Sequence, residues 1–188
     1  ISDQKTGTGD TLKLTVNTIT LQAGEHKLTV GVSVPGCVSD TLVSNLNLKI
    51  NTDPKTALSV GTNGPVCNGN QAKFYILKPE IGTTYQIFDG QNAVSLSANA
   101  QGDSLVLTLN QLSIGDHDLK ARATNAGCKV AELGASGKIT INSAPKTNLE
   151  AFINGPVCLG NEAEVKIYPS EIGKFYEVRV KNTSISDQ

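Results

Sequence analysis

Residues 63–70 read Asn-Gly-Pro-Val-Cys-Asn-Gly-Asn, and the stretch returns as Asn-Gly-Pro-Val-Cys-Leu-Gly-Asn at residues 154–161. The offset is 91 residues, and the likeness continues without a gap as far as Tyr85 and Tyr176. Repetition at a fixed period is the sequence signature of a repeat architecture. We therefore expect a tandem array of one domain type.

A second repeated block precedes each return of this stretch. Residues 10–17, Asp-Thr-Leu-Lys-Leu-Thr-Val-Asn, match residues 103–110, Asp-Ser-Leu-Val-Leu-Thr-Leu-Asn, at an offset of 93. From Leu21 onward the offset is 91, which places two inserted residues near positions 18–20. The repeat therefore extends over the whole chain.

The two ends of the chain carry the same four residues, Ile-Ser-Asp-Gln, at 1–4 and 185–188. If residues 185–188 are superposed on the identical residues 1–4, the repeated blocks follow one another across this join in the same order and without a gap. We therefore expect a window cut from a longer array. Its parts are the back of one domain (1–57), a complete domain (58–148) and the front of a third (149–188). The alternative is a complete subunit whose two ends pair between copies.

The composition argues against two classes of function, nucleic-acid binding and membrane insertion. The formal net charge is −1, which provides no basic footprint for nucleic acid. No apolar run is long enough to span a bilayer. Methionine and tryptophan are absent, as is common in polar extracellular repeats. We expect neither a nucleic-acid partner nor membrane insertion by this segment.

The four cysteines recur with the repeat, as Gly-Cys at Cys37 and Cys128 and as Val-Cys-x-Gly at Cys67 and Cys158. This spacing differs from the C-x-x-C pairs of zinc and redox sites. Regular single cysteines in a polar chain favour a disulfide framework, which forms in an oxidising compartment. We therefore predict a disulfide-bonded, extracellular protein.

Alternation of apolar and polar residues with period 2 dominates the chain, for example at Leu12, Leu14 and Val16. Such alternation predicts strands with one face on a core and the other in water. Short strands separated by Pro, Gly, Asn and Asp predict an all-β fold of tandem immunoglobulin-like antiparallel β-sandwich domains. In the complete domain the predicted strands A, B, C, C′, E, F and G are 57–62, 71–77, 84–89, 93–97, 105–110, 117–125 and 137–142.

His26 and His117 occupy equivalent positions at the corner between strands E and F. Many such sandwiches have a tyrosine there that bonds back to the backbone, and an imidazole can make the same kind of bond. We interpret both histidines as structural, because no second histidine or carboxylate cluster supports a pH switch or a metal site. Asp116 and Asp118 flank His117 at a turn, where carboxylates can contribute to a calcium site, but the residues around His26 lack the second acid.

The pairing of the cysteines stays open. Cys67 precedes strand B and Cys128 follows strand F, and these strands run the same way in this topology. A disulfide needs Cα atoms within ~7 Å, whereas a seven-residue strand spans roughly 23 Å. A bond between Cys67 and Cys128 of one domain would require that 93–97 does not cross the sandwich. The alternative is a bond across a domain junction, from Cys67 to the Cys37 equivalent of the following unit.

Three features of the sequence point to a known family: Val-Cys-x-Gly before strand B, Tyr85 in strand C, and Gly-Cys after strand F. They resemble the immunoglobulin-like repeats of Bacteroidota surface proteins, found in very large adhesins and gliding-motility proteins exported by the type IX secretion route. The resemblance implies a structural segment, a stalk or filament, of a secreted cell-surface adhesin. Its implied partners are neighbouring copies of the repeat in an array or filament, and surface glycans or other cells.

The resemblance also implies glycosylation. Proteins of these bacteria are O-glycosylated at Asp-(Ser/Thr)-aliphatic sequences, which occur here at residues 10–12, 40–42 and 103–105. The candidate O-linked sites are therefore Thr11, Thr41 and Ser104. The alternative is that these aspartates only form turns before strands.

No catalytic motif is present: the chain lacks G-x-S-x-G, H-E-x-x-H and a phosphate-binding glycine-rich loop. We expect no enzymatic activity, no catalytic residue, no cofactor and no metal. Two alternatives to the stalk remain. One is a self-assembling extracellular filament or sheath subunit joined by strand complementation. The other is a glycan-binding or partner-binding immunoglobulin-like module that uses a loop such as 89–104.

Overall fold

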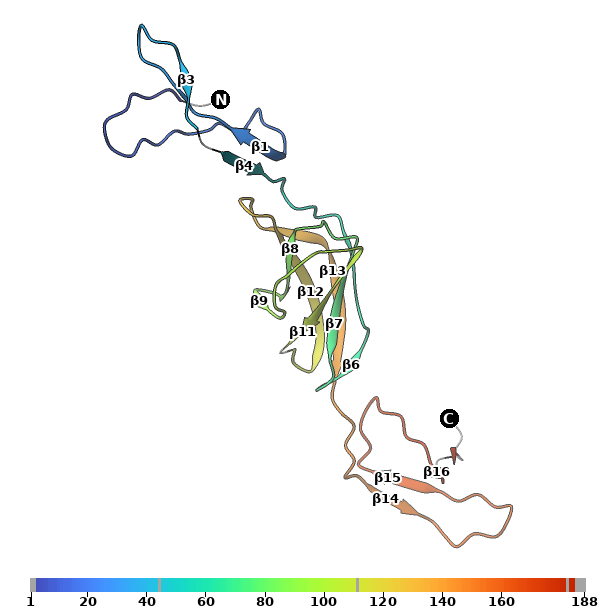
Figure 1. Ribbon diagram of the computed structural model, residues 1–188. Coiled ribbons are helices and arrows are strands. Elements are labelled where there is room, and N and C mark those ends of the chain that lie inside the picture. The colour runs from blue at the N-terminus through green and yellow to red at the C-terminus, as the bar shows by residue number, and fades with distance from the viewer. Residues whose placement is uncertain (1–2, 44, 111, 182, 185–188) are drawn as a thin grey trace. The chain divides into compact units, whose positions relative to one another are not determined.

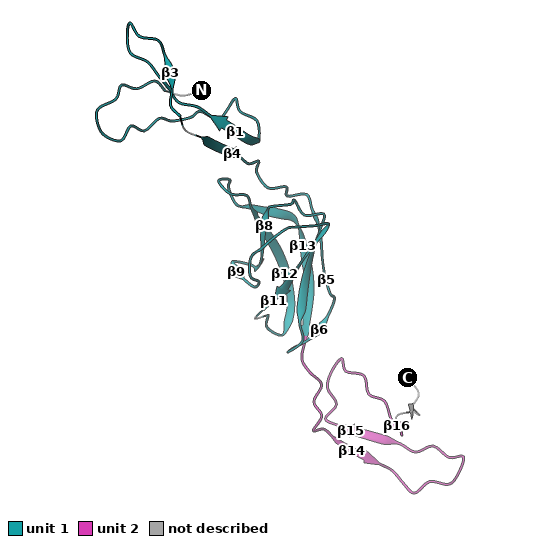
Figure 2. Ribbon diagram, in the orientation of Figure 1, with its two compact units in different colours: residues 1–141 teal, residues 142–188 magenta. Residues whose placement is uncertain are grey.

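The computed structural model describes residues 3–43, 45–110, 112–181 and 183–184. It divides into two compact units, residues 1–141 and residues 142–188 (Figure 2). Every regular element among the described residues is a β-strand, so the prediction of an all-β chain is confirmed. The repeated tetrapeptide at 1–4 and 185–188 lies largely outside the described residues.

The central part of the first unit contains two sheets around one hydrophobic core (Figure 1). The smaller sheet has the order β11-β7-β5, with bounds β5 Ser59–Thr62, β7 Ala72–Leu77 and β11 Ser104–Leu109. The larger has the order β10-β8-β12-β13-β6, and β9 also pairs with β8. Its bounds are β6 Val66–Cys67, β8 Thr84–Asp89, β9 Asn92–Ala93, β10 Ala98–Asn99, β12 Gly115–Thr124 and β13 Ala131–Asn142.

The alternation in the sequence places every second side chain of these strands in the core. Phe74 and Ile76 of β7 face Ile87 and Leu119 of the other sheet, and all four are fully buried. Burying a large apolar side chain stabilises a fold by about 1.5–3 kcal/mol. The complete buried set is Ala72, Phe74, Ile76, Tyr85, Ile87, Val94, Ala100, Leu107, Leu109, Leu119, Ala121, Ala123, Leu133, Ile139 and Ile141.

Gly137 in β13 allows the two sheets to approach each other. A Cβ atom at this position would lie 2.5 Å from Cε2 and 3.1 Å from Cδ2 of Phe74. The aromatic ring of the opposite sheet therefore occupies the space that a side chain would need. This glycine is required by packing rather than by backbone conformation.

Two-stranded hairpins stand on either side of this domain in the sequence. In the first unit, β1 (Gly24–Leu28) pairs with β4 (Leu46–Ile50), and β2 (Gly31–Val32) pairs with β3 (Asp40–Thr41). In the second unit, β14 (Glu150–Ile153) pairs with β15 (Val165–Tyr168), and β16 (Arg179–Val180) pairs with β17 (Thr183–Ser184). Isolated hairpins of this kind are at best marginally stable in water.

The registers of these hairpins repeat the registers of the central domain. Every pair of the β1–β4 ladder, from Gly24–Ile50 to Leu28–Leu46, has a counterpart 91 residues later in the β12–β13 ladder. The β14–β15 ladder is likewise the β5–β7 ladder shifted by 91 residues. The sequence repeat is therefore also a repeat of strand pairing.

Most predicted strands of the central domain are confirmed to within two residues, but two predictions there are wrong. The segment 93–97 is not one strand, because β9 and β10 pair separately with β8. Between them the Ile87 N–H donates to Ser95 Oγ at 2.9 Å, so a side chain replaces the backbone acceptor that a continuous strand would supply. The last strand begins at Ala131 rather than at 137.

The prediction of a strand around Leu12, Leu14 and Val16 is also wrong, because residues 10–15 form no strand in the structure. Their counterpart β11 is paired along its whole length with β7. The described residues before position 51 contain no copy of β7, so this stretch has no ladder to join.

Candidate functional site

A polar network fastens the linker after β4 to one end of the central domain. Asn51 Nδ2 donates to the carbonyl oxygen of Ala126 at 2.9 Å, and Asn125 Nδ2 donates to the carbonyl oxygen of Thr52 at 2.9 Å. The linker and the central domain thus each supply one side-chain amide as donor and one backbone carbonyl as acceptor. We call the network of residues 51–56 with Glu80, Asn125 and Cys128 the linker clamp.

The clamp continues along the linker. The backbone N–H of Lys55 donates to Glu80 Oε2 at 3.2 Å, and the N–H of Gly134 in β13 donates to the carbonyl oxygen of Thr56 at 3.0 Å. Pro54, immediately before Lys55, is buried, and its ring fixes the local backbone angle φ. The linker is therefore bonded to the domain that follows it.

A buried threonine orients one arm of the clamp. Thr83 is fully buried, and its Oγ1 donates to Asn125 Oδ1 at 2.6 Å. Because the amide oxygen accepts this bond, the amide nitrogen of Asn125 is left to donate to Thr52. The arrangement holds the asparagine in the orientation that the linker needs.

The second unit repeats the same contact. The N–H of Lys146 donates to Glu171 Oε2 at 2.8 Å, 91 residues after the bond between Lys55 and Glu80. In both copies the glutamate N–H also donates to a tyrosine hydroxyl, Glu171 to Tyr176 at 2.9 Å and Glu80 to Tyr85 at 3.0 Å. This one contact of the clamp, from a linker lysine N–H to a glutamate held by a tyrosine, therefore recurs with the sequence repeat.

The thiol of Cys128 contacts the backbone of the linker. Its Sγ is 3.2 Å from the carbonyl oxygen of Thr52 and 3.5 Å from that of Asn51. It is half-buried, whereas Cys37, Cys67 and Cys158 are exposed, and all four are free thiols in this structure. The disulfide framework stays a prediction.

The fold does rule out one of the two disulfide pairings. Cys128 lies in the turn that precedes Ala131, the first residue of β13. Cys67, on the neighbouring strand β6, lines a shallow hollow together with Ile141 near the other end of β13. The ten residues between these ends span roughly 33 Å, far beyond the ~7 Å limit for the Cα atoms of a disulfide. Cys67 and Cys128 of one domain therefore cannot bond to each other.

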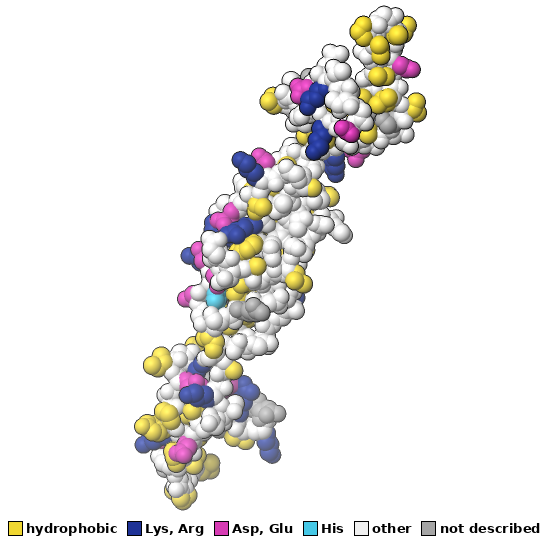
Figure 3. All heavy atoms as spheres, turned by 90° about the vertical axis from the view of Figure 1, so that its left-hand side faces the viewer, with side chains coloured by type: hydrophobic (Ala, Val, Ile, Leu, Met, Phe, Trp, Pro, Cys, Tyr) yellow, Lys and Arg dark blue, Asp and Glu magenta, His cyan; other side chains and the backbone are white. Residues whose placement is uncertain are grey.

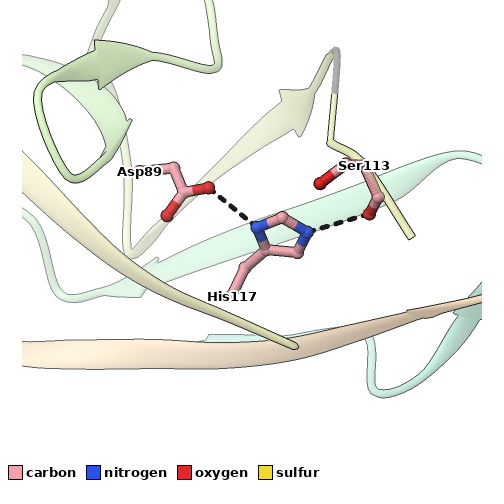
Figure 4. A network of polar contacts seen from close by, with 3 residues as sticks. All are labelled: Asp89, Ser113 and His117. Carbon is pink, nitrogen blue, oxygen red and sulfur yellow. Dashed lines mark hydrogen bonds and ion pairs between the residues drawn. The ribbon is translucent and has the colours of Figure 1, made fainter. Parts of the chain in front are cut away.

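His117 forms a second polar network, shown in Figure 4. Its Nδ1 is 2.7 Å from Asp89 Oδ2, and its Nε2 is 2.9 Å from the carbonyl oxygen of Ser113. Both partners are acceptors, so the ring donates from both nitrogens only as the imidazolium. The bond to the Ser113 carbonyl and the nearby Asp89 carboxylate raise the pKa of His117, against the opposing effect of burial.

The prediction that both histidines form a hydrogen bond to the backbone is confirmed. His26 Nε2 lies 2.7 Å from the carbonyl oxygen of Gln22, the counterpart of the bond between His117 and Ser113. His117 also has a carboxylate partner that the sequence does not predict, because Asp89 Oδ2 lies 2.7 Å from its Nδ1. Asp89 lies 28 residues away in sequence, and only the pairing of β8 with β12 brings it to the ring.

The candidate glycosylation sites Thr11, Thr41 and Ser104 are all exposed. Thr41 ends β3 and Ser104 begins β11. The Asp40 carboxylate accepts a bond from the Thr41 N–H at 2.7 Å, so this aspartate also makes the local contact expected of a turn former.

Among the described residues, no three histidine, cysteine or acidic side chains gather closely enough to hold a metal ion. Nor does the described part of the chain contain a helix of the length and hydropathy required to span a membrane. A comparison of the sequence with models of protein families and with curated proteins found no match.

Proposed function

We propose that this chain is a structural repeat segment, a stalk or filament, of a large secreted bacterial cell-surface adhesin. Its modules are tandem immunoglobulin-like antiparallel β-sandwiches, with parts of three of them at 1–57, 58–148 and 149–188. The observation that supports this most strongly is the linker clamp, whose bond from a linker lysine N–H to a glutamate recurs 91 residues apart at Glu80 and Glu171. A linker bonded to its domain has fewer conformations than a free one, and a spacer needs that stiffness.

The immunoglobulin-like part of the proposal is supported by the order of strands. One sheet joins strands in the positions of A, B and E, as β5, β7 and β11, and the other joins C, F and G, as β8, β12 and β13. The chain leaves β5, passes through Asn63–Pro65 and enters β6 in the second sheet. This order of strands supports the proposal of an immunoglobulin-like sandwich.

The same arrangement suggests how the domain resists tension. The chain enters the domain through β5 and β6 and leaves it through β13, and β6 and β13 are hydrogen-bonded neighbours. A pull on the two ends of the domain therefore acts across this ladder and across the core between the sheets. The function proposed is mechanical, and it needs no ligand.

The proposal is tested on the native polypeptide and on intact cells. A denaturing, reducing gel or mass spectrum should give a mass far above the 19.7 kDa of this sequence, and antibodies against 58–148 should label the cell surface. A native mass near that value, or a protein found only inside cells, contradicts the adhesin stalk.

A second candidate is a filament subunit that assembles by strand complementation. The observation that favours it is the exposure of large apolar side chains on both hairpin-bearing segments, such as Leu14, Tyr176 and Val180. In that case the native mass would equal that of this chain, and the polypeptide would polymerise after purification.

A further inference from the structure

We propose that the free edge of β11 in the central domain pairs with β11 of a second copy, as antiparallel strands that join two small sheets into one. A two-fold axis relates the copies, so the contact is closed and uses the same surface on both. It also makes the two chains run in opposite directions. The inference therefore rests on the proposed function in one step, which is that the chains joined are stalks of two facing cells.

β11 is one edge of the small sheet, and the opposite edge is covered. At β5, Thr62 Oγ1 donates to the carbonyl oxygen of Lys138 at 2.7 Å, and the linker before β5 accepts a bond from the N–H of Gly134. Both donor and acceptor partners belong to β13. Among the described residues, no strand pairs with β11 on the side away from β7. The large sheet ends in the two-residue strands β6, β9 and β10, so β11 is the longer edge.

The hydrogen bonds at the two ends of β11 show which of its backbone groups are free. The Lys78 N–H donates to the Asp103 carbonyl oxygen at 2.7 Å, toward β7, and the Asn110 N–H donates to the Val94 carbonyl oxygen at 2.7 Å, outside the small sheet. Backbone groups of successive residues in a strand point to opposite edges. The groups that point away from β7 are therefore those of Ser104, Val106 and Thr108.

The composition of this edge suits a strand partner. The six residues of β11, Ser-Leu-Val-Leu-Thr-Leu, include no charge and no proline, and their register with β7 has no bulge. Val106 at the centre is 48% exposed. Natural proteins protect a free edge with charges, prolines or bulges, because an unprotected edge pairs with other chains. β11 has none of these protections.

The sequence repeat contains a protected version of the same strand. Residues 10–17 are the counterparts of residues 103–110, and Lys13 stands at the position of Val106. A lysine at the centre would meet its own copy across the two-fold axis, and like charges directly opposite each other destabilise a sheet. The proposed pairing is therefore specific to domains of the central type.

The free backbone groups determine the register. A pairing centred on Val106 places Val106 opposite itself and Ser104 opposite Thr108, so all three free residues of each copy exchange backbone hydrogen bonds. Leu105 then lies opposite Leu107, and both cores are on the same side of the joined sheet. The outer face has a valine pair flanked by two hydroxyl pairs, which are favourable cross-strand neighbours.

The charges at the two ends of the edge favour the antiparallel direction. Asp103 precedes β11, and Lys73 lies opposite Thr108 near the other end of the β11–β7 ladder. Reversal brings Asp103 of each copy to the end where the other copy has Lys73, whereas parallel pairing would place the two aspartates together. In Figure 3 the charged side chains of the central domain gather along one margin, and the rest of the visible surface is mostly uncharged.

Disulfide trapping between single-cysteine variants tests the pairing and its register. In a background with the four native cysteines changed to serine, Val106→Cys should form a dimer on mild oxidation, because opposed residues of a hydrogen-bonded pair have Cα atoms about 5.5 Å apart, within disulfide range. Ser104→Cys alone should give at least tenfold less dimer, since its two copies lie roughly 14 Å apart along the strands. Mixing it with size-tagged Thr108→Cys should restore the dimer.

Hydrogen exchange of the unmodified chain tests the same contact without engineered cysteines. Raising the protein concentration should slow exchange of the Val106 and Thr108 amides at least tenfold. The Leu105 and Leu107 amides, which face β7, are internal controls. Val106→Lys should abolish the concentration dependence and leave the circular dichroism spectrum unchanged, because the side chain lies on the outer face.

Beads coupled to the chain through its N-terminus test the pairing of facing stalks. They should cluster, and beads with Val106→Lys should not, while Val130→Lys, at a position 62% exposed and outside β11, should cluster like the unmodified chain. Equal trapping of Val106→Cys and Ser104→Cys, Val106 exchange that is independent of concentration, or clustering that Val106→Lys does not reduce overturns the proposal. None of these results bears on the stalk itself, which the native mass and surface labelling test separately.

Discussion

The ring of Phe74 in β7 stands where a side chain on Gly137 in β13 would have to be, 2.5 Å from the position of its Cβ. The two residues belong to different sheets, so this contact sets the distance between the sheets at the centre of the core. A protein core tolerates little change in volume at such a contact. Both members of the pair are therefore sensitive to substitution.

We predict that Gly137→Ala lowers the free energy of unfolding of the central domain by about 1–3 kcal/mol, the usual effect of overpacking a core. The matched control is Gly134→Ala in the same strand, where the nearest atom to an added Cβ is the Thr56 carbonyl oxygen at 3.8 Å. Urea unfolding measures both. Equal stability of the two variants would show that the ring and the glycine are not tightly packed.

A double-mutant cycle tests the packing of Phe74 against Gly137, whose counterparts at an offset of 91 residues are Val165 and Leu46. Gly137→Leu should destabilise the central domain more than Gly137→Ala does, because the larger side chain meets the ring of Phe74. Adding Phe74→Val, the residue at the counterpart position 165, should recover part of that loss. The coupling energy should be of the order of 1 kcal/mol or more, and strictly additive effects would contradict the account.

The linker clamp should protect the peptide bond after Lys55 from trypsin. The Lys55 side chain is exposed, but its N–H is bonded to Glu80, so cleavage requires the linker to detach locally. Glu80→Ala or Asn125→Ala should speed cleavage at Lys55 several-fold. Glu25→Ala, at an exposed position outside the clamp, is the control, and unchanged cleavage in both clamp variants would mean that the linker is not held.

The stability of the central domain should depend on pH through His117. Its pKa is raised above the ordinary 6.5 in the folded state, so the imidazolium bonds stabilise the fold fully below about pH 6.5. This contribution is lost as the pH rises through the raised pKa. The difference in unfolding free energy between the unmodified chain and His117→Gln should therefore shrink from pH 6 to pH 8, and Asp89→Asn should weaken the dependence. A constant difference over this range would contradict the network of Figure 4.

The four thiols should differ in reactivity in the reduced protein. Cys128 is half-buried and lies 3.2 Å from the Thr52 carbonyl oxygen, so iodoacetamide should modify it more slowly than Cys37, Cys67 or Cys158. Mass spectrometry of tryptic peptides gives the four rates. In protein isolated without reductant, no peptide should join Cys67 to Cys128 of the same domain, and such a peptide would contradict the fold.

The sequence predicts the repeat, the all-β class and most strands, because period-2 alternation and turn residues are local signals. It does not predict the clamp. Asn51 and Asn125 are far apart along the chain, and neither differs in its neighbours from the many other asparagines. Asp89 was missed for the same reason, since its proximity to His117 comes from the pairing of β8 with β12.

The absence of a strand at residues 10–15 has a different cause. The alternation of Leu12, Leu14 and Val16 is as regular as that of β11, but a strand needs a partner for its backbone N–H and C=O groups. Period-2 alternation reports which face of a strand would be buried and says nothing about whether the neighbouring strand is in reach.

The central claim, that the repeat is a mechanical module, is tested most directly by pulling a single chain by its two ends. The account predicts one discrete unfolding event for the domain at 58–141, with a gain in contour length on the order of 300 Å, set by about 3.6 Å per extended residue. The two-stranded β1–β4 and β14–β15 ladders should extend at lower force without a comparable event, because isolated two-stranded ribbons are marginally stable. A smooth extension of the whole chain with no discrete event would contradict the claim.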